Sequence, residues 1–422
     1  MTEWPMVTVS ELEADDVLLV QDGNHGEYRP RPDEFVSDGT AFIRATELSD
    51  GVVDFAGAGR IDDVARNRVR KGIGASGDVL FSHKGTVGKL ARVPLGAEDF
   101  VCSPQTTFWR TLDEDRLRRD YLYCFMRSRL FIDQWWVRKG ETDMADYVSL
   151  TAQRQLRVMI PPVDVQRRIA EPITAMDDLI ENNRRRIELL EQMAQAIYRQ
   201  WFVHFRYPGH ENVAPIDSPL GLIPEGWQVK SLATVAKLTM GQSPPSQYYN
   251  TRGVGKFFHQ GVTDFGPHFP VNRKYCSSDG RSASAGDILI SVRAPVGRLN
   301  IALDDMTIGR GLASARSRTD EQSLLFRALK DVVFAEEDAM GSGTIFRAIG
   351  KQELQRIQLV VPPRHIGTLA ESQLANNSAL LRALTLQGRT LGGIRDVLLP
   401  RLVTGQIDAS SLDLDAVMDP EG

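Results

Sequence analysis

The sequence predicts an α+β fold in which two pseudo-repeated mixed α/β domains are separated by two long helices that form an antiparallel coiled coil. Three observations predict it. Motifs recur in the same order in both halves of the 422-residue chain, the residues between them form short β-rich runs, and each half ends in a long heptad repeat. Apolar residues make up 42% and charged residues 25% of the chain, which is enough for each half to bury a core.

Three pairs of motifs indicate an internal duplication. SGDVLFSHKGTVGKLA at 76–91 matches AGDILISVRAPVGRLN at 285–300, since each has Gly-Asp, three strand residues, a short turn, and Val-Gly followed by a base. LRVMIPP in the first half matches IQLVVPP in the second, and TEWPMVTVSEL matches PEGWQVKSLAT. Chance could supply one such pair but hardly three in order, so each half is expected to be one domain followed by one helix.

The motifs also set the expected boundaries. Short β-rich runs such as DVLLV, AFIRA, DVLFS and FVCS dominate the first domain, and FFHQGV, DILISV and LNIAL dominate the second. The stretch FRYPGHENVAPIDSPLGLIPEGW has no period and is rich in Pro and Gly, which predicts a linker. The expected segments are a first domain at 1–162, a first spacer helix at 163–205, a linker at 206–226, a second domain at 227–363, a second spacer helix at 364–405, and an acidic C-terminal tail at 406–422.

The first helix carries a strict heptad repeat. Its seam positions alternate spacings of four and three residues, and Asn183 breaks their apolar character. A seam this narrow suits knobs-into-holes pairing with another helix rather than the covering of a globular core. Because Pro172 lacks a backbone N–H, we expect the regular helix to begin there. The expected seam residues are Ile173, Met176, Ile180, Asn183, Ile187, Leu190 and Ile197.

The second helix repeats this spacing and supplies the partner. Nineteen residues separate the Pro-Pro pair from the Asn-Asn pair in the first half and twelve in the second, a difference of one heptad that keeps the seam on the same face. We expect the two helices to lie antiparallel, with Asn183 and Asn377 as polar seam residues that fix the register. The alternative is that these asparagines simply lie on a helix surface. The expected seam residues are Leu374, Asn377, Leu381, Leu384 and Leu391.

Charge is distributed unevenly along the chain. The net charge is −5, but the five acids from Asp408 onward account for it. Residues 60–92 hold eight Lys or Arg against three Asp, and residues 273–318 hold eight against four. Such runs are most often solvated faces, yet a local basic surface matters more for nucleic-acid binding than the total charge.

Other classes of protein are disfavoured by what the sequence lacks. No apolar run reaches the roughly 18 to 20 residues that span a bilayer, and the N-terminus is too acidic for a signal peptide. We therefore expect a cytoplasmic protein with no membrane partner. Cys102, Cys124 and Cys276 are scattered, which predicts neither a disulfide framework nor a metal site.

Motifs for catalysis are also missing. An amino-methyltransferase needs an aromatic residue after its Pro-Pro pair to stack on a flipped base, whereas SPPS at 243–246 ends in Ser246. No GxxxxGK(S/T) motif for ATP is present, and PDEF lacks convincing downstream residues for a nuclease. We therefore expect no catalytic residue, no metal and no cofactor on this chain.

The chain resembles the specificity subunit of type I restriction-modification systems over nearly its whole length. The residues that carry the resemblance are PPVDVQRRIAEPITAMDDLIENNRRRIELLEQMAQAIYRQWFVHF, LGLIPEGW, GDILISVRAPVGRLNIA with IGRGLA, and RDVLLPRLVTGQID. The resemblance implies a non-catalytic subunit with two target-recognition domains, each reading one half of a bipartite sequence in double-stranded DNA for adenine methylation or restriction. It also implies that the helices set the gap and dock two modification (methyltransferase) subunits, that two restriction (motor-nuclease) subunits join, and that these partners hold S-adenosylmethionine, ATP and Mg2+.

DNA contacts would then come from the two domains. Lys and Arg bind phosphates, whereas Arg, Lys, Asn and Gln reach base edges. For each residue a purely structural role is an even alternative, and Arg293 could instead anchor its own turn. The candidates in the first domain are Arg29, Arg31, Arg44, His83, Lys84 and Thr86, and those in the second are Tyr248, Tyr249, Arg252, His259, Gln260, Lys274, Arg293, Arg298 and Arg310.

Two other functions stay open from the sequence. A non-catalytic coiled-coil scaffold whose domains bind proteins would show little salt dependence of any DNA affinity, whereas phosphate-driven binding weakens steeply with salt. A self-sufficient methyltransferase is disfavoured by Ser246, and cofactor binding by the isolated chain would revive it.

Overall fold

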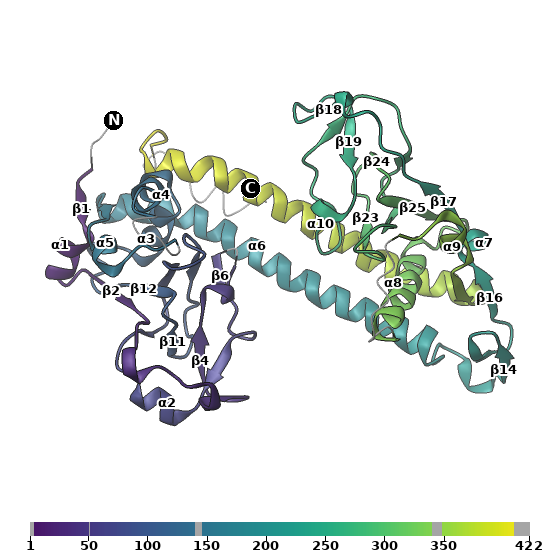
Figure 1. Cartoon of the computed structure of the whole chain (residues 1–422), viewed down its shortest axis with the longest axis horizontal. Helices are drawn as coiled ribbons and strands as arrows, with labels where there is room; N and C mark the ends of the chain where they lie inside the picture. Colours follow the sequence, from purple (N-terminus) through teal and green to yellow (C-terminus); the bar gives the residue numbers. More distant parts are fainter. Residues whose placement is uncertain (1–3, 50, 140–145, 340–347, 409–422) are drawn as a thin grey trace. The chain divides into compact units, whose positions relative to one another are not determined.

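A computed structural model describes residues 4–49, 51–139, 146–339 and 348–408, and the chain divides into two compact units. Unit 1 combines Met1–Asn182 with Gln387–Gly422, and unit 2 is Asn183–Leu386. Both long helices, α6 and α10, contribute residues to both units (Figure 1). Most of the expected acidic tail, residues 409–422, lies outside the described residues.

Unit 1 contains two sheets and a separate strand pair. The larger sheet has six strands in the order β2-β12-β9-β10-β6-β5, the smaller has five in the order β3-β7-β4-β11-β8, and β1 pairs with β13. The strand bounds are β1 Met6–Thr8, β2 Leu18–Asp22, β3 Phe35–Val36, β4 Thr40–Ile43, β5 Leu48–Ser49, β6 Gly51–Val53, β7 Gly59–Ile61, β8 Ile73–Gly74, β9 Val79–Ser82, β10 Leu90–Arg92, β11 Phe100–Cys102, β12 Thr106–Thr111 and β13 Arg157–Met159. The pairing of β1 with β13 joins the two ends of the first domain.

Helices and aromatic side chains complete the core of unit 1. Phe81 of β9 and Trp109 of β12 each meet Phe131 of α4 edge to face, with ring-centroid distances of 6.4 and 5.5 Å. Ile169 of α6 and Leu402 of α10 belong to the same buried cluster, so the long helices are part of this core. The helix bounds are α1 Val9–Ala14, α2 Asp63–Arg68, α3 Arg119–Met126, α4 Arg129–Trp136 and α5 Leu150–Arg154.

Unit 2 repeats the architecture. It has a four-stranded sheet in the order β17-β25-β22-β23, a five-stranded sheet in the order β18-β20-β19-β24-β21, and the pair β16 with β26. The strand bounds are β16 Gln228–Ser231, β17 Ala236–Met240, β18 Tyr249–Asn250, β19 Lys256–His259, β20 Tyr275–Cys276, β21 Ser282–Ala283, β22 Ile288–Ser291, β23 Leu299–Ile301, β24 Met306–Ile308, β25 Leu312–Ser317 and β26 Gln358–Val361. Its short helices are α7 Leu232–Val235, α8 Gln322–Ala339 and α9 Lys351–Arg356. Ile288, Ile290, Phe326 and Leu329 lie in its main buried cluster.

Strand registers show that the two domains are copies of one fold. The parallel pair β4 and β11 aligns Ile43 with Cys102, and the parallel pair β19 and β24 aligns His259 with Ile308. An antiparallel strand flanks each side of the pair, β7 and β8 in unit 1 and β20 and β21 in unit 2. The predicted fold class is therefore confirmed.

The repeated Gly-Asp motif places a buried carboxylate in both domains. Asp78 is fully buried and accepts hydrogen bonds of 2.7 and 2.8 Å from the guanidinium of Arg110. Asp287 accepts a bond of 2.5 Å from Nε of Arg316. Each carboxylate also accepts a main-chain N–H three residues before it, so the charge is compensated where it is buried.

The turn after this strand is closed in the same way in both copies. The Ser82 hydroxyl donates to the carbonyl of Thr86 at 2.6 Å, and the Ser291 hydroxyl donates to the carbonyl of Pro295 at 2.7 Å. Both turns project a basic residue, Lys84 in unit 1 and Arg293 in unit 2, and both of these side chains are exposed. The two copies therefore also match in this turn, which carries an exposed basic residue in each domain.

The two long helices pair antiparallel within each unit. Helix α6 spans Val163–Tyr198 and continues as a π-helical turn at Arg199–Val203, and α10 spans Arg364–Val403. In unit 1, Ile173 shares a buried cluster with Leu399. In unit 2, Ile187 and Leu190 pack with Leu381, and Ala194 packs with Leu374. Residue numbers along α10 thus fall as those along α6 rise.

The expectation that the regular helix begins at Pro172 is wrong. Helix α6 begins at Val163 and contains Pro172. A proline inside a helix removes one backbone hydrogen bond. The neighbouring Ile169 and Ile173 are completely buried and Ala170 is almost so, and this apolar burial offsets the lost bond.

The expected seam residues are all buried or half-buried. Ile173, Leu374, Leu381 and Leu384 are buried, and Asn183 is only 4% exposed although it is polar. The half-buried members of the expected seam are Ile180, Ile187, Leu190, Ile197, Asn377 and Leu391, and Met176 is buried. The heptad spacing therefore coincides with the inward faces of both helices.

The segment between the halves is more ordered than its composition indicates. β14 (Pro215–Ser218) and β15 (Gly221–Pro224) form a two-stranded antiparallel hairpin within the expected linker. Trp227 lies 5.5 Å from Phe202 and 5.2 Å from Tyr207 between ring centroids, and it is 3% exposed. Aromatic packing therefore fixes both ends of this segment to unit 2.

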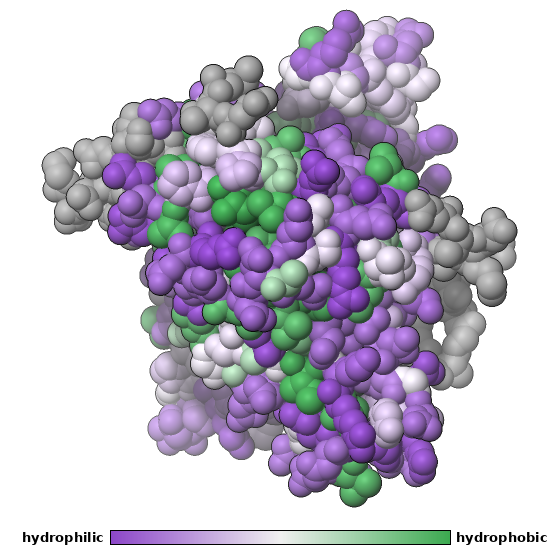
Figure 2. All heavy atoms as spheres, turned by 90° about the vertical axis from the view of Figure 1, so that its left-hand side faces the viewer, coloured by the Kyte–Doolittle hydropathy of each residue, from purple (hydrophilic) through white to green (hydrophobic). Residues whose placement is uncertain are grey.

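Hydrophilic residues predominate on the face seen in Figure 2, and apolar residues form smaller patches between them. On α4 the ring of Trp136 is 58% exposed, and the ammonium of Lys139 lies 4.5 Å from its centre. Within the described ranges, every helix is either too short or too polar to cross a membrane.

Candidate nucleic-acid interface

In each domain the parallel strand pair ends in a loop that exposes a long polar side chain. Arg44 directly follows β4 and Gln260 directly follows β19, and both are exposed. The neighbouring strand continues into the same loop region, because Ser103 N–H donates to the carbonyl of Ile43 and Gly309 N–H to that of His259, each at 2.8 Å. Arg44 and Gln260 therefore occupy equivalent positions.

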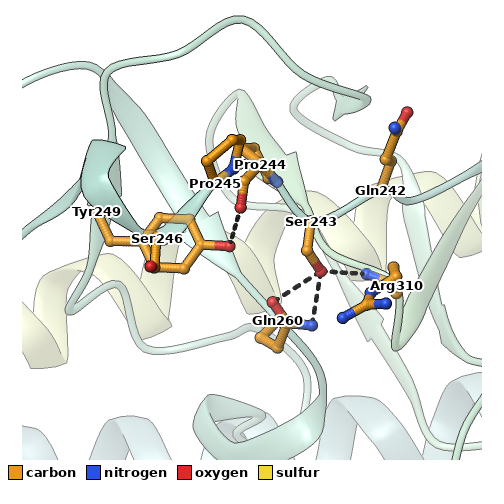
Figure 3. A pocket seen from close by; sticks show the side chains of 8 residues that line it. All are labelled: Gln242, Ser243, Pro244, Pro245, Ser246, Tyr249, Gln260 and Arg310. Carbon is orange, nitrogen blue, oxygen red and sulfur yellow. Dashed lines mark hydrogen bonds between the residues drawn. The ribbon is translucent and has the colours of Figure 1, made fainter.

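In unit 2 this loop region forms a pocket of about 720 Å³ (Figure 3). Its lining contains one cation, no acid and several amide and hydroxyl groups. The lining residues are Gln242, Ser243, Pro244, Pro245, Ser246, Tyr249, Gln260 and Arg310. Such a lining offers donors and acceptors to a polar ligand and a positive charge to an anionic one.

Ser243 organises one side of the pocket. Its hydroxyl lies 3.0 Å from Oε1 and 2.7 Å from Nε2 of Gln260, and it accepts a hydrogen bond of 3.1 Å from the backbone N–H of Arg310. Figure 3 shows Ser243, Gln260 and Arg310 together on this side, with Tyr249 opposite. The Gln260 amide is thus fixed by a neighbour and is not free to rotate.

Tyr249 forms the other side. Its ring stacks on Phe258 of β19 at 4.3 Å between centroids, and its hydroxyl donates to the carbonyl of Pro244 at 2.7 Å. Burial raises the pKa of Tyr249, so the phenol stays protonated at neutral pH. The adjacent Tyr248 is 38% exposed. Tyr249, stacked on Phe258, therefore supports the Pro244-Pro245 segment as a wall of the pocket.

The pocket continues along the backbone to the basic turn. Gly311 N–H donates to the carbonyl of Gln260 at 3.1 Å, and Val292 N–H donates to the carbonyl of Gly311 at 2.9 Å. The exposed Arg293 follows Val292 directly. Backbone hydrogen bonds therefore connect the loops of Gln260 and Arg310 with the turn that carries Arg293.

Unit 1 presents the corresponding surface with different side chains. His83 N–H donates to the carbonyl of Gln105 at 2.9 Å, as Val292 N–H donates to that of Gly311 in unit 2. The exposed Lys84, which follows His83, therefore occupies the position that Arg293 occupies in unit 2. The Lys84 ammonium lies 5.8 Å from the ring centre of Tyr147. Lys89 donates from Nζ to the carbonyl of Ala45 at 2.8 Å, next to Arg44. A second basic surface thus lies at the same end of the first domain.

Comparisons with known proteins agree with this arrangement. Residues 33–192 match the family model described as type I restriction modification DNA specificity domain. A protein of Methanocaldococcus jannaschii named "Putative type I restriction enzyme MjaX specificity subunit" is 29% identical over 333 residues, which are 77% of this chain and 77% of that protein. The MjaIX specificity subunit of the same organism is 24% identical over 78% of this chain and 79% of that protein.

The crystal structure of a type I restriction-modification system S subunit from M. genitalium shares the fold, with a TM-score of 0.64, 14% identity, and coverage of 94% of this chain and 96% of that chain. The chain is thus similar in sequence to specificity subunits of type I restriction enzymes, and it shares the fold of one such subunit. The similarity extends over both halves, because each curated relative named here aligns with more than three quarters of the chain.

Two of the predicted DNA-contact residues lie inside the fold. His83 is 1% exposed, and its Nδ1 lies 3.2 Å from the carbonyl of Val148. His259 is 2% exposed, and its Nε2 lies 2.9 Å from Oδ1 of Asn272. Burial lowers the pKa of both imidazoles, so both are neutral at neutral pH. Neither presents an edge to solvent, and we remove both from the direct contacts.

The other predicted residues are exposed, apart from the half-buried Tyr249, but they do not all gather at one place. The structure places Tyr249, Gln260 and Arg310 in the lining of the pocket, and backbone hydrogen bonds connect this loop region to Val292, which precedes Arg293. Lys84 and Thr86 lie in one turn of unit 1, where the Thr86 carbonyl accepts a hydrogen bond from the Ser82 hydroxyl. The remaining exposed candidates lie on separate turns and strand ends, and they are Arg29, Arg31, Arg252, Lys274 and Arg298.

Sequence reasoning missed Ser243 and Gln105. The SPPS motif lacks the aromatic residue of a methyltransferase, and nothing else in the sequence marks its serine as a pocket residue. Gln105 becomes relevant only through its backbone bond to His83. Among the residues that the structure describes, no cluster of three or more His, Cys, Asp or Glu is arranged to hold a metal ion.

Proposed function

We propose that this chain is a type I specificity subunit that reads a bipartite sequence in double-stranded DNA, one half-site with each domain, for adenine methylation or restriction by partner subunits. The observation that carries the proposal is the pair of equivalent surfaces. Each combines an exposed basic residue on the turn after the Gly-Asp strand, Lys84 or Arg293, with an exposed polar residue after the parallel strands, Arg44 or Gln260. Two copies of one surface suit two short half-sites.

The chemistry of each surface suits DNA. Exposed Lys84, Arg293 and Arg310 supply cations for phosphates, and these contacts give affinity without sequence preference. Arg44 and Gln260 carry the side chains that form paired hydrogen bonds with base edges in the major groove. The domains thus offer both classes of contact that a sequence reader needs.

The helices supply a rigid spacer for such a reader. Helix α6 has 36 residues and α10 has 40. At 1.5 Å per residue, 36 residues extend about 54 Å, more than one turn of B-DNA, which is about 34 Å. We propose that this length sets the gap between the half-sites.

The outer faces of the helices offer a surface for the modification subunits. Leu189 is 58%, Met193 is 55% and Val397 is 55% exposed, although residues of this kind are usually buried. We propose that two methyltransferase subunits dock on these helices and that two restriction subunits join the complex. S-adenosylmethionine, ATP and Mg2+ would be held by these partners, and this chain would have no catalytic role.

Methylome mapping tests the proposal. The full chain is expressed with its modification partner, and methylated adenines are mapped by single-molecule sequencing with and without this chain. We expect one motif with two short half-sites and a fixed nonspecific gap, seen only when this chain is present. Methylation that does not depend on this chain, or half-sites without a fixed spacing, would contradict the proposal.

Heptad deletions test the spacer. We expect removal of seven residues from each helix, 180–186 and 385–391, to shorten the gap by about three base pairs, because seven residues of helix extend about 10 Å. Removal of only three residues from each helix rotates the seam and should prevent assembly. An unchanged gap in the seven-residue variant would refute the spacer.

A protein-binding scaffold is the second candidate. It is favoured by the exposed apolar residues of the helices, and not by the basic turns. It predicts that DNA affinity of the assembled complex changes little between low and physiological salt, whereas a DNA reader loses affinity steeply.

A further inference from the structure

We propose that the residue after the first strand of the parallel pair is a base-reading position in each domain, with Arg44 reading a guanine and Gln260 reading an adenine. This inference rests on the proposed function and names the base edges that the two surfaces recognise. It assigns different chemistry to two structurally equivalent positions. The two half-sites would therefore differ at that position.

The equivalence rests on strand register. Ile43 pairs with Cys102 in unit 1 and His259 pairs with Ile308 in unit 2, both in parallel strands. In each domain the residue after the second strand donates its N–H to the carbonyl before the reading position, at 2.8 Å. Arg44 and Gln260 therefore leave the sheet at the same point.

Gln260 is held in a conformation suited to adenine. Ser243 contacts both ends of its amide, at 3.0 and 2.7 Å. A single hydroxyl within reach of both Oε1 and Nε2 lies on the amide edge where donor and acceptor are adjacent. This is the edge that pairs with N7 and N6 of adenine, so the base would take the place of the hydroxyl there. A fixed amide loses less conformational entropy on binding than a free one.

Two glycines leave the space that this conformation needs. A Cβ built on Gly309 would lie 2.8 Å from Oε1 of Gln260, and one built on Gly311 would lie 2.5 Å from its carbonyl oxygen. Both distances are too short for any other residue without a shift. The sequence Gly-Arg-Gly thus accommodates Gln260 and places Arg310 between the glycines, at the rim of the pocket.

Arg44 has the free donors that guanine requires. Its guanidinium lies 5.6 Å from the ring centre of Phe35 and 6.0 Å from that of Phe42, and its backbone N–H is held by the Glu47 carboxylate at 2.6 Å. Within the described residues no carboxylate forms an ion pair with this guanidinium, whereas Arg68 is paired with Glu34. An oriented, unneutralised guanidinium forms paired hydrogen bonds with O6 and N7 of guanine.

Neither side chain belongs to a buried core, although Arg44 contacts the rings of Phe35 and Phe42 and Gln260 contacts Ser243. Both are exposed, and the parallel strands beneath them are joined by main-chain bonds. Substitution at these positions should leave the unfolding temperature of the subunit unchanged. A change in DNA recognition can then be assigned to the lost side chain.

The test uses the full chain assembled with its modification subunits. The motif is mapped for Gln260→Ala and Arg44→Ala, and affinity is measured by competition between duplexes that carry the wild-type motif and duplexes with single base-pair changes. Gln247→Ala and Arg129→Ala are matched controls, since both residues are exposed and lie outside the proposed reading positions. Unfolding temperature is recorded for all variants.

We expect Gln260→Ala to reduce discrimination at one A·T pair of one half-site by about 5- to 150-fold, and Arg44→Ala to do the same at one G·C pair of the other half-site. The gap and the remaining positions should not change, and the controls should read the wild-type motif. Gln260→Arg should shift the preference at its position from A·T toward G·C.

Ser243→Ala tests the positioning role of the serine. Because this change removes the hydroxyl that contacts the reading edge of the Gln260 amide, we expect discrimination to change at the same A·T pair as in Gln260→Ala and at no other. The combined variant should be no worse than Gln260→Ala alone, since both changes act through one amide.

Three outcomes separate this inference from the proposed function. A wild-type complex that reads no bipartite motif contradicts the proposed function and the inference with it. A bipartite motif that both alanine variants read unchanged overturns the inference alone. A uniform loss of affinity for every duplex also overturns it, because that is the signature of a phosphate contact.

Discussion

Glu191 on α6 accepts two hydrogen bonds from the guanidinium of Arg327 on α8, at 2.7 and 2.6 Å. Lys330 contacts the same carboxylate, and Nδ1 of His268 lies 3.7 Å from it. The Glu191 and Arg327 side chains are only 16% and 8% exposed. This cluster fixes the second domain to the helix of its own unit, so the direction of the proposed reading surface depends on it.

We expect Glu191→Gln to lower the free energy of unfolding of unit 2 by about 3 kcal/mol, because it leaves the buried charge of Arg327 without its partner. Urea denaturation followed by tryptophan fluorescence measures the loss. The control is Glu188→Gln on the same helix, whose carboxylate is 61% exposed and 3.9 Å from Arg184, and which should change stability by less than about 0.5 kcal/mol. Equal effects of the two variants would contradict a special role for Glu191.

The same cluster predicts an acid-sensitive unit. Burial by itself would raise the pKa of Glu191, but the hydrogen bonds and charges of Arg327 and Lys330 outweigh it and lower the pKa from 4.5 to about 2. A lowered pKa in the folded state means that the stabilisation is complete above about pH 4.5 and is lost as the pH falls toward 2. Urea midpoints between pH 6 and pH 3 should therefore fall more for the wild type than for Glu191→Gln. Parallel curves would show that Glu191 does not contribute.

Asp177 plays the comparable part in unit 1. Its carboxylate accepts hydrogen bonds from Arg127 of α3 at 2.6 Å and from Arg395 of α10 at 2.7 Å, and it is 12% exposed. We expect Asp177→Asn to destabilise unit 1 by about 3 kcal/mol in thermal or urea unfolding, since two cations lose one shared anion. Asp133→Asn provides the contrast, because that residue is 67% exposed and its ion pair with Arg129 is 3.9 Å long.

Glycines in α10 and at the end of β17 should respond in opposite directions to alanine. A Cβ on Gly393 would meet nothing within 4 Å, so Gly393→Ala should stabilise the helix by about 1 kcal/mol. A Cβ on Gly241 would lie 2.2 Å from the carbonyl oxygen of Gly309, so Gly241→Ala should destabilise unit 2. Unfolding temperatures of the two variants check both signs.

Lys84 and Arg293 should act as phosphate contacts. We expect Lys84→Ala or Arg293→Ala to weaken binding of the assembled complex uniformly across sequences and to reduce the slope of log affinity against log salt by about 1 for each variant. Competition binding at several salt concentrations measures both. A change in base preference would instead assign these residues to base reading.

The duplication and the helices were predictable because their signals are local or periodic. The matching motifs at 76–91 and 285–300 predict two copies of one domain, and the spacing of four and three residues predicts two helices with one inward face. The inward positions that the structure buries, such as Leu381 and Leu384, are those that the heptads select. Hydrophobic periodicity was sufficient here because the buried face of a helix appears in the sequence as a regular spacing of apolar residues.

The proposed reading surfaces depend on contacts that no local pattern encodes. His83 and Lys84 are neighbours of similar chemistry, yet strand pairing buries the first and exposes the second. Pro172 looks like a helix start, but the core of unit 1 holds it inside α6. The equivalence of Arg44 and Gln260 arises from parallel strands whose partners lie about 50 to 60 residues apart, and so only the tertiary structure decides it. The sequence by itself determined two domains and two paired helices, and long-range strand register decided which side chains those domains present.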